Sequence, residues 1–373
     1  MKTIHLKRLH LAFGFLLVLA APISHGNTVG FQGINVSIPT SKNFSEATGM
    51  KPLEKTLKIR ACIYDPIGAS GPISQYAKDI VLEAKRWNVD LTIRSFTDER
   101  VAADEFKAGI CDAVAVTTLR AKQFNNFVGS FDAVGNFSNY DQMKTALRLV
   151  HSNPQITPLL INGDYQVGGL IPLGAVYIMV RDRKIDSIEK AAGKKVAVME
   201  WDRMQAKMVQ QLGAQPVASD ITNFGTKFNN GIVDIIAAPA LAFYPLELYR
   251  GVSDKGGIYD IPLAMMTASI VFHRERFLKE IPDLDERLSK IRAFVLNYID
   301  TGFDVIQRID ESIEKRFWLP LGQGERDKYF RMMRDARLQM TKEGYYDSRM
   351  MGILKRVRCR HEPTHYECST NDE

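Results

Sequence analysis

The sequence predicts an α/β protein of two lobes, in which each lobe is an open, mostly parallel sheet flanked by helices. Three observations lead to this prediction. Segments with strand and helix patterns alternate along the chain, which is typical of parallel sheets. The alternation occurs twice, and a long segment with helical spacing follows the second run. We expect that long helix to span both lobes.

The first 26 residues have the composition of a cleavable secretory signal. Lys2, Lys7 and Arg8 form a basic head, an apolar run covers 11–23, and small residues stand at the two positions within 24–26 that a signal peptidase reads. Such a segment is removed from the mature chain. Because the apolar run is shorter than the roughly 20 residues that span a bilayer, cleavage is favoured over the alternative of an uncleaved anchor. We expect a soluble, exported protein.

The composition argues against a nucleic-acid partner. The 373 residues have a formal net charge of +6, and three of the basic residues belong to the signal, so the mature charge is +3. Binding to nucleic acid would call for a concentrated basic surface. The 347 residues after residue 26 suit two lobes better than one core. We expect a monomer.

The first lobe is predicted over 57–172, after a loose polar arm at 27–56. Strands alternate there with helices whose apolar residues repeat at helical spacing. The predicted segments are strands at 57–64, 89–96 and 112–116 and helices at 72–87 and 98–108.

The second lobe is predicted over 173–259, where the same alternation returns. The predicted segments are strands at 175–181, 195–199, 213–217 and 233–237 and helices at 185–192, 201–212 and 221–230. A long strand at 260–272 would return the chain to the first lobe over 260–283.

A long helix is predicted from 284 to about 317, because apolar residues repeat there at helical spacing. At 1.5 Å per residue it would be on the order of 50 Å long. It opens a helical segment over 284–345, and Gly302 is the expected site of a bend.

Four cysteines follow the signal, and an even number in an exported chain favours disulfides. Cys62 lies in a predicted strand beside the strand that Cys111 opens, and Cys359 and Cys368 are close in sequence. We expect the pairs 62–111 and 359–368, the second closing a C-terminal tail over 346–373. The alternative is a metal site in the tail, whose spacing lacks the paired C-x2-C form of zinc sites. Its ligands would be Cys359, His361, His365 and Cys368. We predict no metal and no cofactor.

Three stretches of the chain carry a resemblance to a known family. They are 106–116 (FKAGICDAVAV), 192–198 with 212–217 (AGKKVAV and LGAQPV), and 228–239 (FNNGIVDIIAAP). In this order they resemble the DctP-type solute receptors of tripartite ATP-independent periplasmic (TRAP) transporters, and the likeness covers roughly 57–320. Within that family the chain is most similar to the AdeT-like solute-binding proteins. The resemblance implies a periplasmic binding protein fold, the periplasm of a Gram-negative bacterium, a small-molecule ligand and an inner-membrane transporter subunit as partner.

Two residues of the family's pattern are absent from this chain. The resemblance places the family's strand arginine, which clamps a substrate carboxylate, at Ala197, and its asparagine at Ala238. Alanine cannot supply the bidentate grip of a guanidinium. The family's organic-acid ligands therefore either use a displaced arginine here or give way to another small polar ligand, such as a cation.

The ligand site is expected where strands end. Open α/β sheets bind ligands at the carboxyl ends of their strands, and two facing lobes bring those ends to one cleft. The candidates are Tyr64, Asp65, Ser70, Thr117, Thr118 and Arg120 in the first lobe and Glu200, Trp201, Asp202, Arg203 and Tyr244 in the second.

Most of these candidates also have a structural interpretation. Asp202 is placed to cap a helix, Asp65 to shape a turn before Pro66, and Trp201 to pack. The arginines at 120 and 203 can be solvated or paired with the acids at 200 and 202, and the threonines at 117 and 118 can satisfy backbone groups.

The resulting hypothesis is a non-enzymatic binding protein whose lobes close on a ligand for delivery to a membrane transporter. An enzyme is disfavoured because no nucleophile motif or phosphate loop occurs, and His151 and His273 lie in no recognisable motif. The alternative, which the AdeT-like resemblance suggests, is an accessory or drug-sequestering periplasmic protein linked to efflux or antibiotic resistance. A cleft filled by Met199, Trp201 or Tyr244 would favour that alternative.

Overall fold

The sheet is continuous through the whole molecule. The computed structural model describes residues 41–373, so the predicted signal and the arm up to residue 40 lie outside the described residues. The strand order is β2-β1-β3-β9-β5-β8-β6-β7, with β4 beside β5 and β10 beside β9. The strands are β1 (Leu57–Tyr64), β2 (Val89–Phe96), β3 (Ala113–Thr117), β4 (Ile161–Asn162), β5 (Tyr165–Val180), β6 (Lys195–Met199), β7 (Gln215–Ser219), β8 (Ile235–Pro239), β9 (Gly257–His273) and β10 (Trp318–Leu319).

Helices cover the sheet and connect its strands. The α-helices are α1 (Ser41–Thr48), α2 (Pro72–Arg86), α3 (Glu99–Lys107), α4 (Thr118–Ala121), α5 (Asn126–Gly129), α6 (Tyr140–Ser152), α7 (Arg203–Gln211), α8 (Phe224–Asn229), α9 (Leu248–Val252), α10 (Arg274–Leu278), α11 (Leu284–Leu296), α12 (Ile299–Ser312), α13 (Gln323–Lys342) and α14 (Ser348–His361). Short 3-10 turns occupy Gly68–Ser70, Thr157–Leu160, Glu189–Ala191, Ala240–Ala242, Lys315–Phe317 and Tyr366–Ser369.

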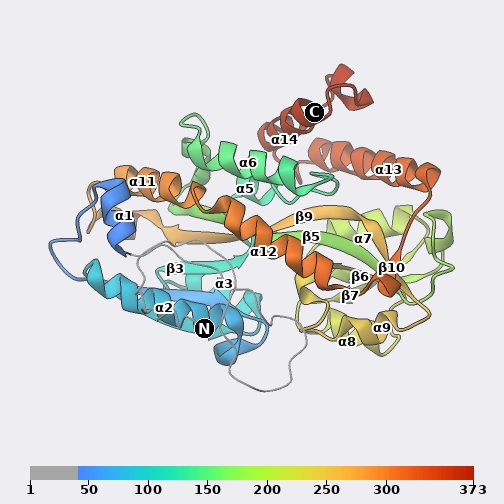
Figure 1. Cartoon of the computed structure of the whole chain (residues 1–373), viewed down its shortest axis with the longest axis horizontal. Helices are drawn as coiled ribbons and strands as arrows, with labels where there is room; N and C mark the ends of the chain where they lie inside the picture. Colours follow the sequence, from blue (N-terminus) through green and yellow to red (C-terminus); the bar gives the residue numbers. More distant parts are fainter. Residues whose placement is uncertain (1–40) are drawn as a thin grey trace, which may run out of the picture.

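Each end of the sheet is a parallel group, which confirms the predicted α/β class. β1 pairs in parallel with β2 and β3, and β6 pairs in parallel with β7 and β8. We call the part built around β2-β1-β3 the first lobe and the part built around β8-β6-β7 the second lobe. Figure 1 shows them side by side, with α2 and α3 on the first and α7, α8 and α9 on the second.

Two long antiparallel strands join the lobes, so the lobes share one sheet. β9 pairs with β3 through residues 268–272. β5 pairs with β8 through residues 176–180, and the predicted strand at 175–181 is only the last part of β5. Between these regions, residues 172–175 of β5 face residues 265–267 of β9, which do not pair with β3, and they do not pair with β8. This stretch is the narrowest part of the sheet.

The long helix predicted from 284 to 317 is two helices. α11 ends at Leu296 and α12 begins at Ile299, so the break comes before the bend expected at Gly302, which lies inside α12. The two helices bury different faces. Leu284 and Phe294 pack into the outer core of the first lobe, whereas α12 packs across the middle of the molecule. One straight helix could not bury both faces.

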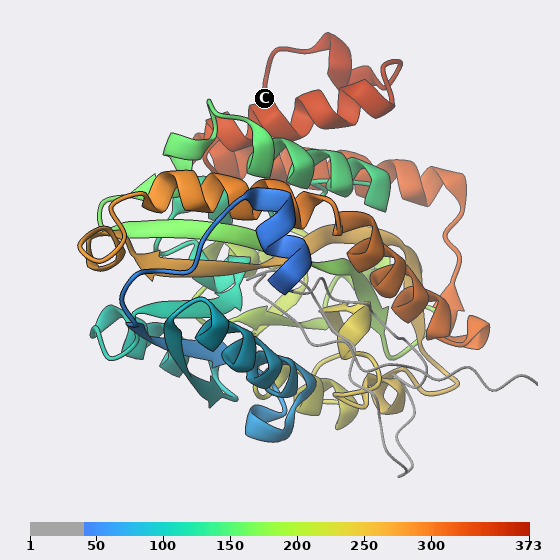
Figure 2. The ribbon, with the colours of Figure 1, turned by 60° about the vertical axis from the view of Figure 1, so that its left-hand side comes forward.

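The predicted crossing of both lobes is made by α12 and α13. In α12, Ile299 and Phe303 join the main core of the first lobe, and Val305 and Ile309 join the core of the second. In Figure 2, α11 and α12 run across the molecule in orange. α13 begins against the second lobe at Tyr329 and ends against the first.

Two local predictions differ from the structure. The arm is helical over Ser41–Thr48, and Met50 and Leu53 after that helix pack with Trp87 and Leu284, so the chain is ordered before residue 57. The predicted helix at 185–192 is only a 3-10 turn at Glu189–Ala191.

Both disulfides pair as predicted, as Cys62–Cys111 and Cys359–Cys368. The sulfur atoms of Cys359 and Cys368 are bonded to each other, which removes them as ligands of the alternative metal site in the tail.

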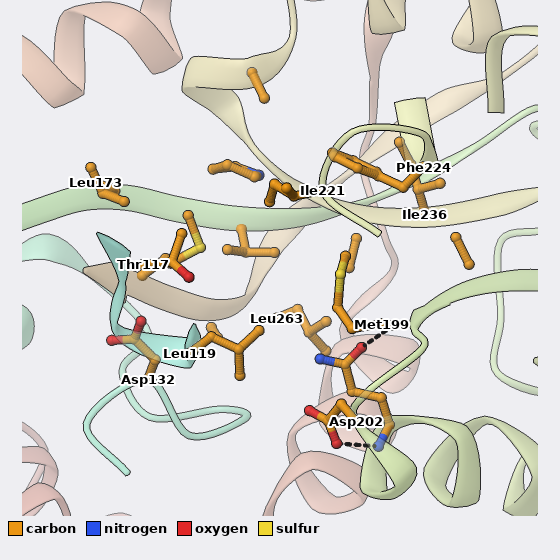
Figure 3. A pocket seen from close by; sticks show the side chains of 18 of the residues that line it. Thr117, Leu119, Asp132, Leu173, Met199, Asp202, Ile221, Phe224, Ile236 and Leu263 are labelled. Carbon is orange, nitrogen blue, oxygen red and sulfur yellow. Dashed lines mark hydrogen bonds between the residues drawn. The ribbon is translucent and has the colours of Figure 1, made fainter. Parts of the chain in front are cut away.

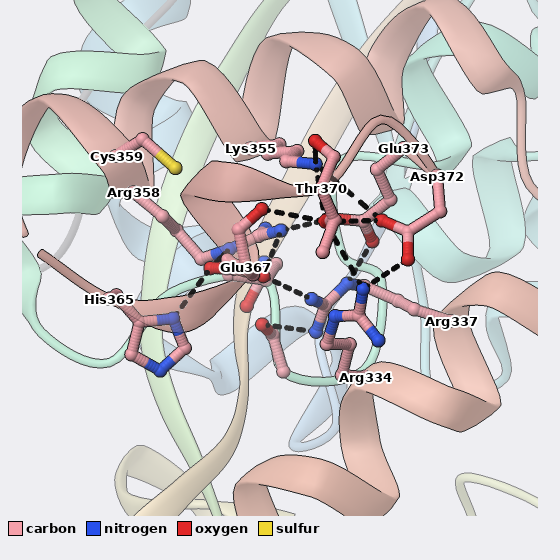
Figure 4. A network of polar contacts seen from close by, with 12 residues as sticks. Arg334, Arg337, Lys355, Arg358, Cys359, His365, Glu367, Thr370, Asp372 and Glu373 are labelled. Atoms are coloured by element: carbon pink, nitrogen blue, oxygen red, sulfur yellow. Dashed lines mark hydrogen bonds and ion pairs between the residues drawn. The ribbon is translucent and has the colours of Figure 1, made fainter. Parts of the chain in front are cut away.

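The C-terminal tail is held against α13 and α14 by buried ion pairs (Figure 4). The guanidinium of Arg337 contacts Glu367 Oε2 at 3.2 Å and Glu373 Oε1 at 2.6 Å. The guanidinium of Arg358 contacts Glu367 Oε1 at 2.8 Å and Glu373 Oε2 at 2.5 Å. Buried charges are stable only when paired in this way. Within residues 41–373, no helix combines the length and hydrophobicity needed to cross a bilayer.

Candidate functional site

A cavity of about 450 Å³ lies between the two lobes. Its walls come from β1, α2 and β3 of the first lobe, from β6, α7 and β8 of the second, and from the middle of β5 and β9. Figure 3 shows Thr117 and Asp132 on one side, Met199 and Asp202 on the other, and Leu263 between them. The carboxyl ends of parallel strands from both lobes therefore open onto one space.

The walls of this cavity are mostly aliphatic. Representative side chains are Ile63, Leu173, Met199, Ile221, Phe224 and Leu263. The ionisable groups among the described lining residues, apart from tyrosines, are the carboxyls of Glu99, Asp132 and Asp202, and this lining contains no lysine, arginine or histidine. The prediction of a small polar ligand implies more polar walls than these.

Glu99 lies at the first-lobe wall, at the start of α3. Its Oε2 accepts hydrogen bonds from Thr117 Oγ1 at 2.7 Å and from Thr117 N at 3.3 Å. Its Oε1 lies 3.4 Å from Arg120 Nε. Burial raises the pKa of Glu99, and the hydrogen bonds from Thr117 and the charge of Arg120 oppose that rise.

Asp132 lies in the segment between α5 and α6 and is held by β9. Thr267 donates to it twice, from Oγ1 at 2.7 Å and from the backbone N at 2.9 Å. Burial raises the pKa of Asp132 to about 7, against the opposing effects of these hydrogen bonds and of Lys122. No ion pair within 4 Å joins Asp132 to another described residue.

Asp202 lies at the second-lobe wall and caps α7, as the structural interpretation of the sequence predicts. Its Oδ1 accepts from Met204 N at 3.0 Å and from Gln205 N at 3.1 Å. Its Oδ2 accepts from Tyr345 Oη at 2.6 Å. Tyr345 lies between α13 and α14, so this contact brings the C-terminal helices to the cavity.

The structure brings three of the eleven sequence candidates to the cavity wall. Tyr64, Thr117 and Asp202 line it. Arg120 and Trp201 lie beside it and contact each other across the lobes, with Arg120 Cζ 4.2 Å from the centre of the Trp201 ring.

The other candidates lie outside the lining. Asp65 is fully buried and accepts from Ile67 N and Ser74 N, so it holds the turn before α2. Thr118 is buried against Thr267 and Ser269 of β9. Tyr244 donates to Ser312 O at 3.0 Å. The remaining three, Ser70, Glu200 and Arg203, are exposed.

Sequence reasoning missed Glu99, Asp132 and the tyrosines at 345 and 346, which also line the cavity. Asp132 lies between 118 and 174, a region where no element was predicted, and it reaches the wall through β9. Glu99 had a signal, since a glutamate in the first turn of a helix next to a candidate strand end can reach that end.

Comparison with solved structures defines the class of protein. A TRAP periplasmic solute-binding protein from Desulfovibrio salexigens with bound orotic acid superposes with a TM-score of 0.65 and 14% identity, over 82% of this chain and 99% of that chain. One from Shewanella oneidensis with bound succinate gives 0.63 and 13%, over 81% and 99%. The fold is that of the TRAP periplasmic solute-binding proteins.

The chain belongs to the AdeT 1/2 family of solute-binding proteins. The model of that family, described as "Solute-binding protein AdeT 1/2", matches residues 82–373. The probable solute-binding protein AdeT1 of Acinetobacter baumannii is 40% identical over 311 residues, which are 83% of this chain and the whole of that relative. AdeT2 of the same organism is 26% identical over 241 residues, 65% of this chain and 98% of the relative. The family resemblance seen in the sequence is confirmed.

Proposed function

We propose that this protein captures a small molecule in the interlobe cavity and delivers it, unaltered, to a membrane transporter subunit. The observation that carries the proposal is the cavity of about 450 Å³ with walls from both lobes. A ligand that touches both lobes favours the closed form by contacts that only this form offers. Of the three side chains that could fill the cleft, Trp201 and Tyr244 do not line the cavity. Met199 lines it but leaves about 450 Å³ open, which supports capture over the accessory alternative.

The hinge for closure is the middle of β5 and β9. In the described part of the chain, residues 172–175 of β5 pair only with β9, so rotation there disturbs few hydrogen bonds. The register shifts between Pro172 and Gly174, and Gly174 has a φ of +99° that residues with a Cβ rarely adopt. We accordingly propose that the boundary between the lobes lies near 172–173 on β5 and near 260–268 on β9.

The proposed setting is the periplasm, reached through the predicted signal at 1–26 and cleavage there, with one chain acting as a monomer. TRAP solute-binding proteins of this fold hold orotic acid and succinate in their structures. A binding role without catalysis is supported by the histidines. His151 bonds to Leu147 O and Leu170 N, His273 bonds to Asp164, and neither lines the cavity.

The proposal is tested by native mass spectrometry on the full chain exported with its own leader and purified without denaturation. We expect a mature chain that begins near residue 27 and carries roughly one small molecule, which is released on unfolding. In the variant Ala197→Trp, a bulky ring projects from β6 into the cavity and should abolish retention. Ile110→Trp adds the same ring at an exposed site and serves as control. Retention by Ala197→Trp, or no retained molecule in the wild type, contradicts capture in this cavity.

A further inference from the structure

We propose that the ligand is an apolar molecule with a single cationic amine group, and that Asp132 is its counter-charge. This inference rests on the proposed function and names the ligand class for the same cavity. It depends on three features of the lining, namely its aliphatic walls, the sign of its ionisable groups and the contacts that each carboxylate already makes.

The walls favour an apolar body. Transfer of apolar ligand surface from water to such walls is favourable by about 25 cal/mol per Å². A sugar acid, or an amine with many hydroxyl groups, would instead lose its hydrogen bonds to water against aliphatic side chains, which costs roughly 1–3 kcal/mol for each unpaired polar group. The side chains of Ile63, Leu173, Ile221 and Leu263 offer such a ligand no donor or acceptor.

The charge of the lining disfavours an anion. The carboxyls of Glu99, Asp132 and Asp202 face the cavity, and no basic side chain does so among the described residues. A ligand carboxylate would meet groups of its own sign in a water-poor space, whereas an ammonium would meet the opposite sign.

Two basic side chains lie near the cavity but outside its lining. Arg120 is held by Glu99 and by the ring of Trp201. The ammonium of Lys122 lies over the rings of Tyr345 and Tyr346, at 4.1 and 4.8 Å from their centres. Burial lowers the pKa of Lys122 to about 8. When all five groups are ionised, three carboxylates face two cations, so the cluster keeps a negative charge.

Asp132 is the carboxylate with room for a ligand. Glu99 is paired with Arg120, and Asp202 is committed to the helix cap and to Tyr345. Among the described residues, only Thr267 donates hydrogen bonds to Asp132, one to each oxygen, and each oxygen keeps a lone pair for another donor. Asp132 is half-buried at the cavity wall and has no ion-pair partner among the described residues, and a ligand ammonium would supply one.

The experiment compares three probes with one skeleton, 4-phenylbutylamine, 4-phenylbutanol and 4-phenylbutyrate. Binding to the full mature protein, freed of retained ligand, is measured by calorimetry at pH 8, where Asp132 is ionised. We expect the amine to bind tightest, the alcohol more weakly, and the carboxylate weakest. In Asp132→Asn, the amine should lose at least roughly tenfold in affinity while the alcohol is unchanged, because a hydrogen bond to a charged group contributes about 1.5–3 kcal/mol.

The controls separate charge from folding. Unchanged affinity for the alcohol shows that the Asp132→Asn cavity is intact, and Asp141→Asn removes a carboxylate at the exposed start of α6 without affecting any probe. The inference is overturned if the carboxylate binds tightest or if none of the probes binds. It is also overturned if Asp132→Asn still prefers the amine. These results would not contradict ligand capture if the exported protein still retains a small molecule. Only a wild-type protein that retains none would also contradict the proposed function.

Discussion

Trp201 and Arg120 belong to different lobes, and their contact lies beside the cavity. Arg120 Cζ stands 4.2 Å from the centre of the Trp201 ring, and Glu99 lies 3.4 Å from Arg120 Nε on the other side. A partly buried contact between a guanidinium and an indole contributes roughly 0.5–2 kcal/mol. Since the contact exists only when the lobes are together, its energy favours the closed form.

Replacing Trp201 by alanine should therefore weaken ligand binding without unfolding the protein. We expect the dissociation constant of the retained ligand to rise between about 2-fold and 30-fold. Trp201→Phe keeps a ring face and should recover part of the affinity. Calorimetry on the two variants measures both effects. Equal affinity of Trp201→Ala and the wild type would mean that the contact has no part in closure.

Residues that follow strands were predictable as site residues, and residues that reach the site through tertiary contacts were not. Tyr64, Thr117 and Asp202 come directly after β1, β3 and β6, so the rule on strand ends identifies them. Asp132 comes from a segment without regular structure and is aimed by Thr267, more than 100 positions away. No local pattern carries that information. Asp65 is a different case, because nearby contacts exclude it, as its structural interpretation predicts: its carboxylate accepts from Ile67 N and Ser74 N.

Three elements meet at one buried carboxylate next to the hinge. Tyr140 of α6 and Tyr177 of β5 donate to Asp310 Oδ2 of α12, at 2.6 and 3.0 Å. Asp310 Oδ1 is buried, and no donor in residues 41–373 reaches it. Burial raises the pKa of Asp310 to about 6, and the two tyrosines oppose that rise. The folded protein therefore holds a proton on Asp310 at a pH where the unfolded chain has released it.

The pH dependence of stability follows from this difference. Because the folded pKa of about 6 lies above the ordinary 3.8, stability increases as the pH falls through 6 and levels off near 4. Asp310→Asn cannot titrate, so the wild type should gain about 1.4 kcal/mol over this variant between pH 8 and pH 5. Thermal unfolding at both pH values measures the gain. Asp304→Asn, on the exposed face of α12, should follow the wild type. A wild-type advantage over Asp310→Asn that does not change with pH refutes the assignment.

At the scale of elements, periodicity located segments well and their ends less well. β1 and β2 match their predicted bounds because turn residues stand at their ends, Asp65 and Pro66 after β1 and Asn88 and Asp98 around β2. The segment 284–317 keeps one helical period in sequence, yet it divides at Tyr298, because α11 and α12 pack against different cores. The helical periodicity of a sequence shows which residues share an apolar face. It does not show which part of the protein that face packs against.

The whole molecule has two lobes but no division between its cores. β5 and β9 belong to both parts of the sheet. α12 places Phe303 in the core of the first lobe and Ile309 in that of the second. On α13, Tyr329 stacks edge-on with Tyr259 of the second lobe, and Met340 packs in the first. If the second lobe unfolded alone, these strands and helices would lose the contacts that they make with it. The lobes should therefore unfold together.

Single-tryptophan variants test this cooperativity, because the lobes carry separate reporters. Trp87 is buried in the first lobe and Trp318 packs on Tyr177 in the second. The double variant Trp201→Phe with Trp318→Phe reports on the first lobe, and Trp87→Phe with Trp201→Phe on the second. In each, the fluorescence midpoint in denaturant should coincide with the midpoint from circular dichroism. Ile309→Ala removes packing from the second-lobe core and should lower the free energy of unfolding by about 2–5 kcal/mol. Added to the first-lobe reporter variant, it should lower the denaturant midpoint that Trp87 reports. If Trp87 does not respond, the lobes are independent folding units and the shared sheet is only a mechanical link.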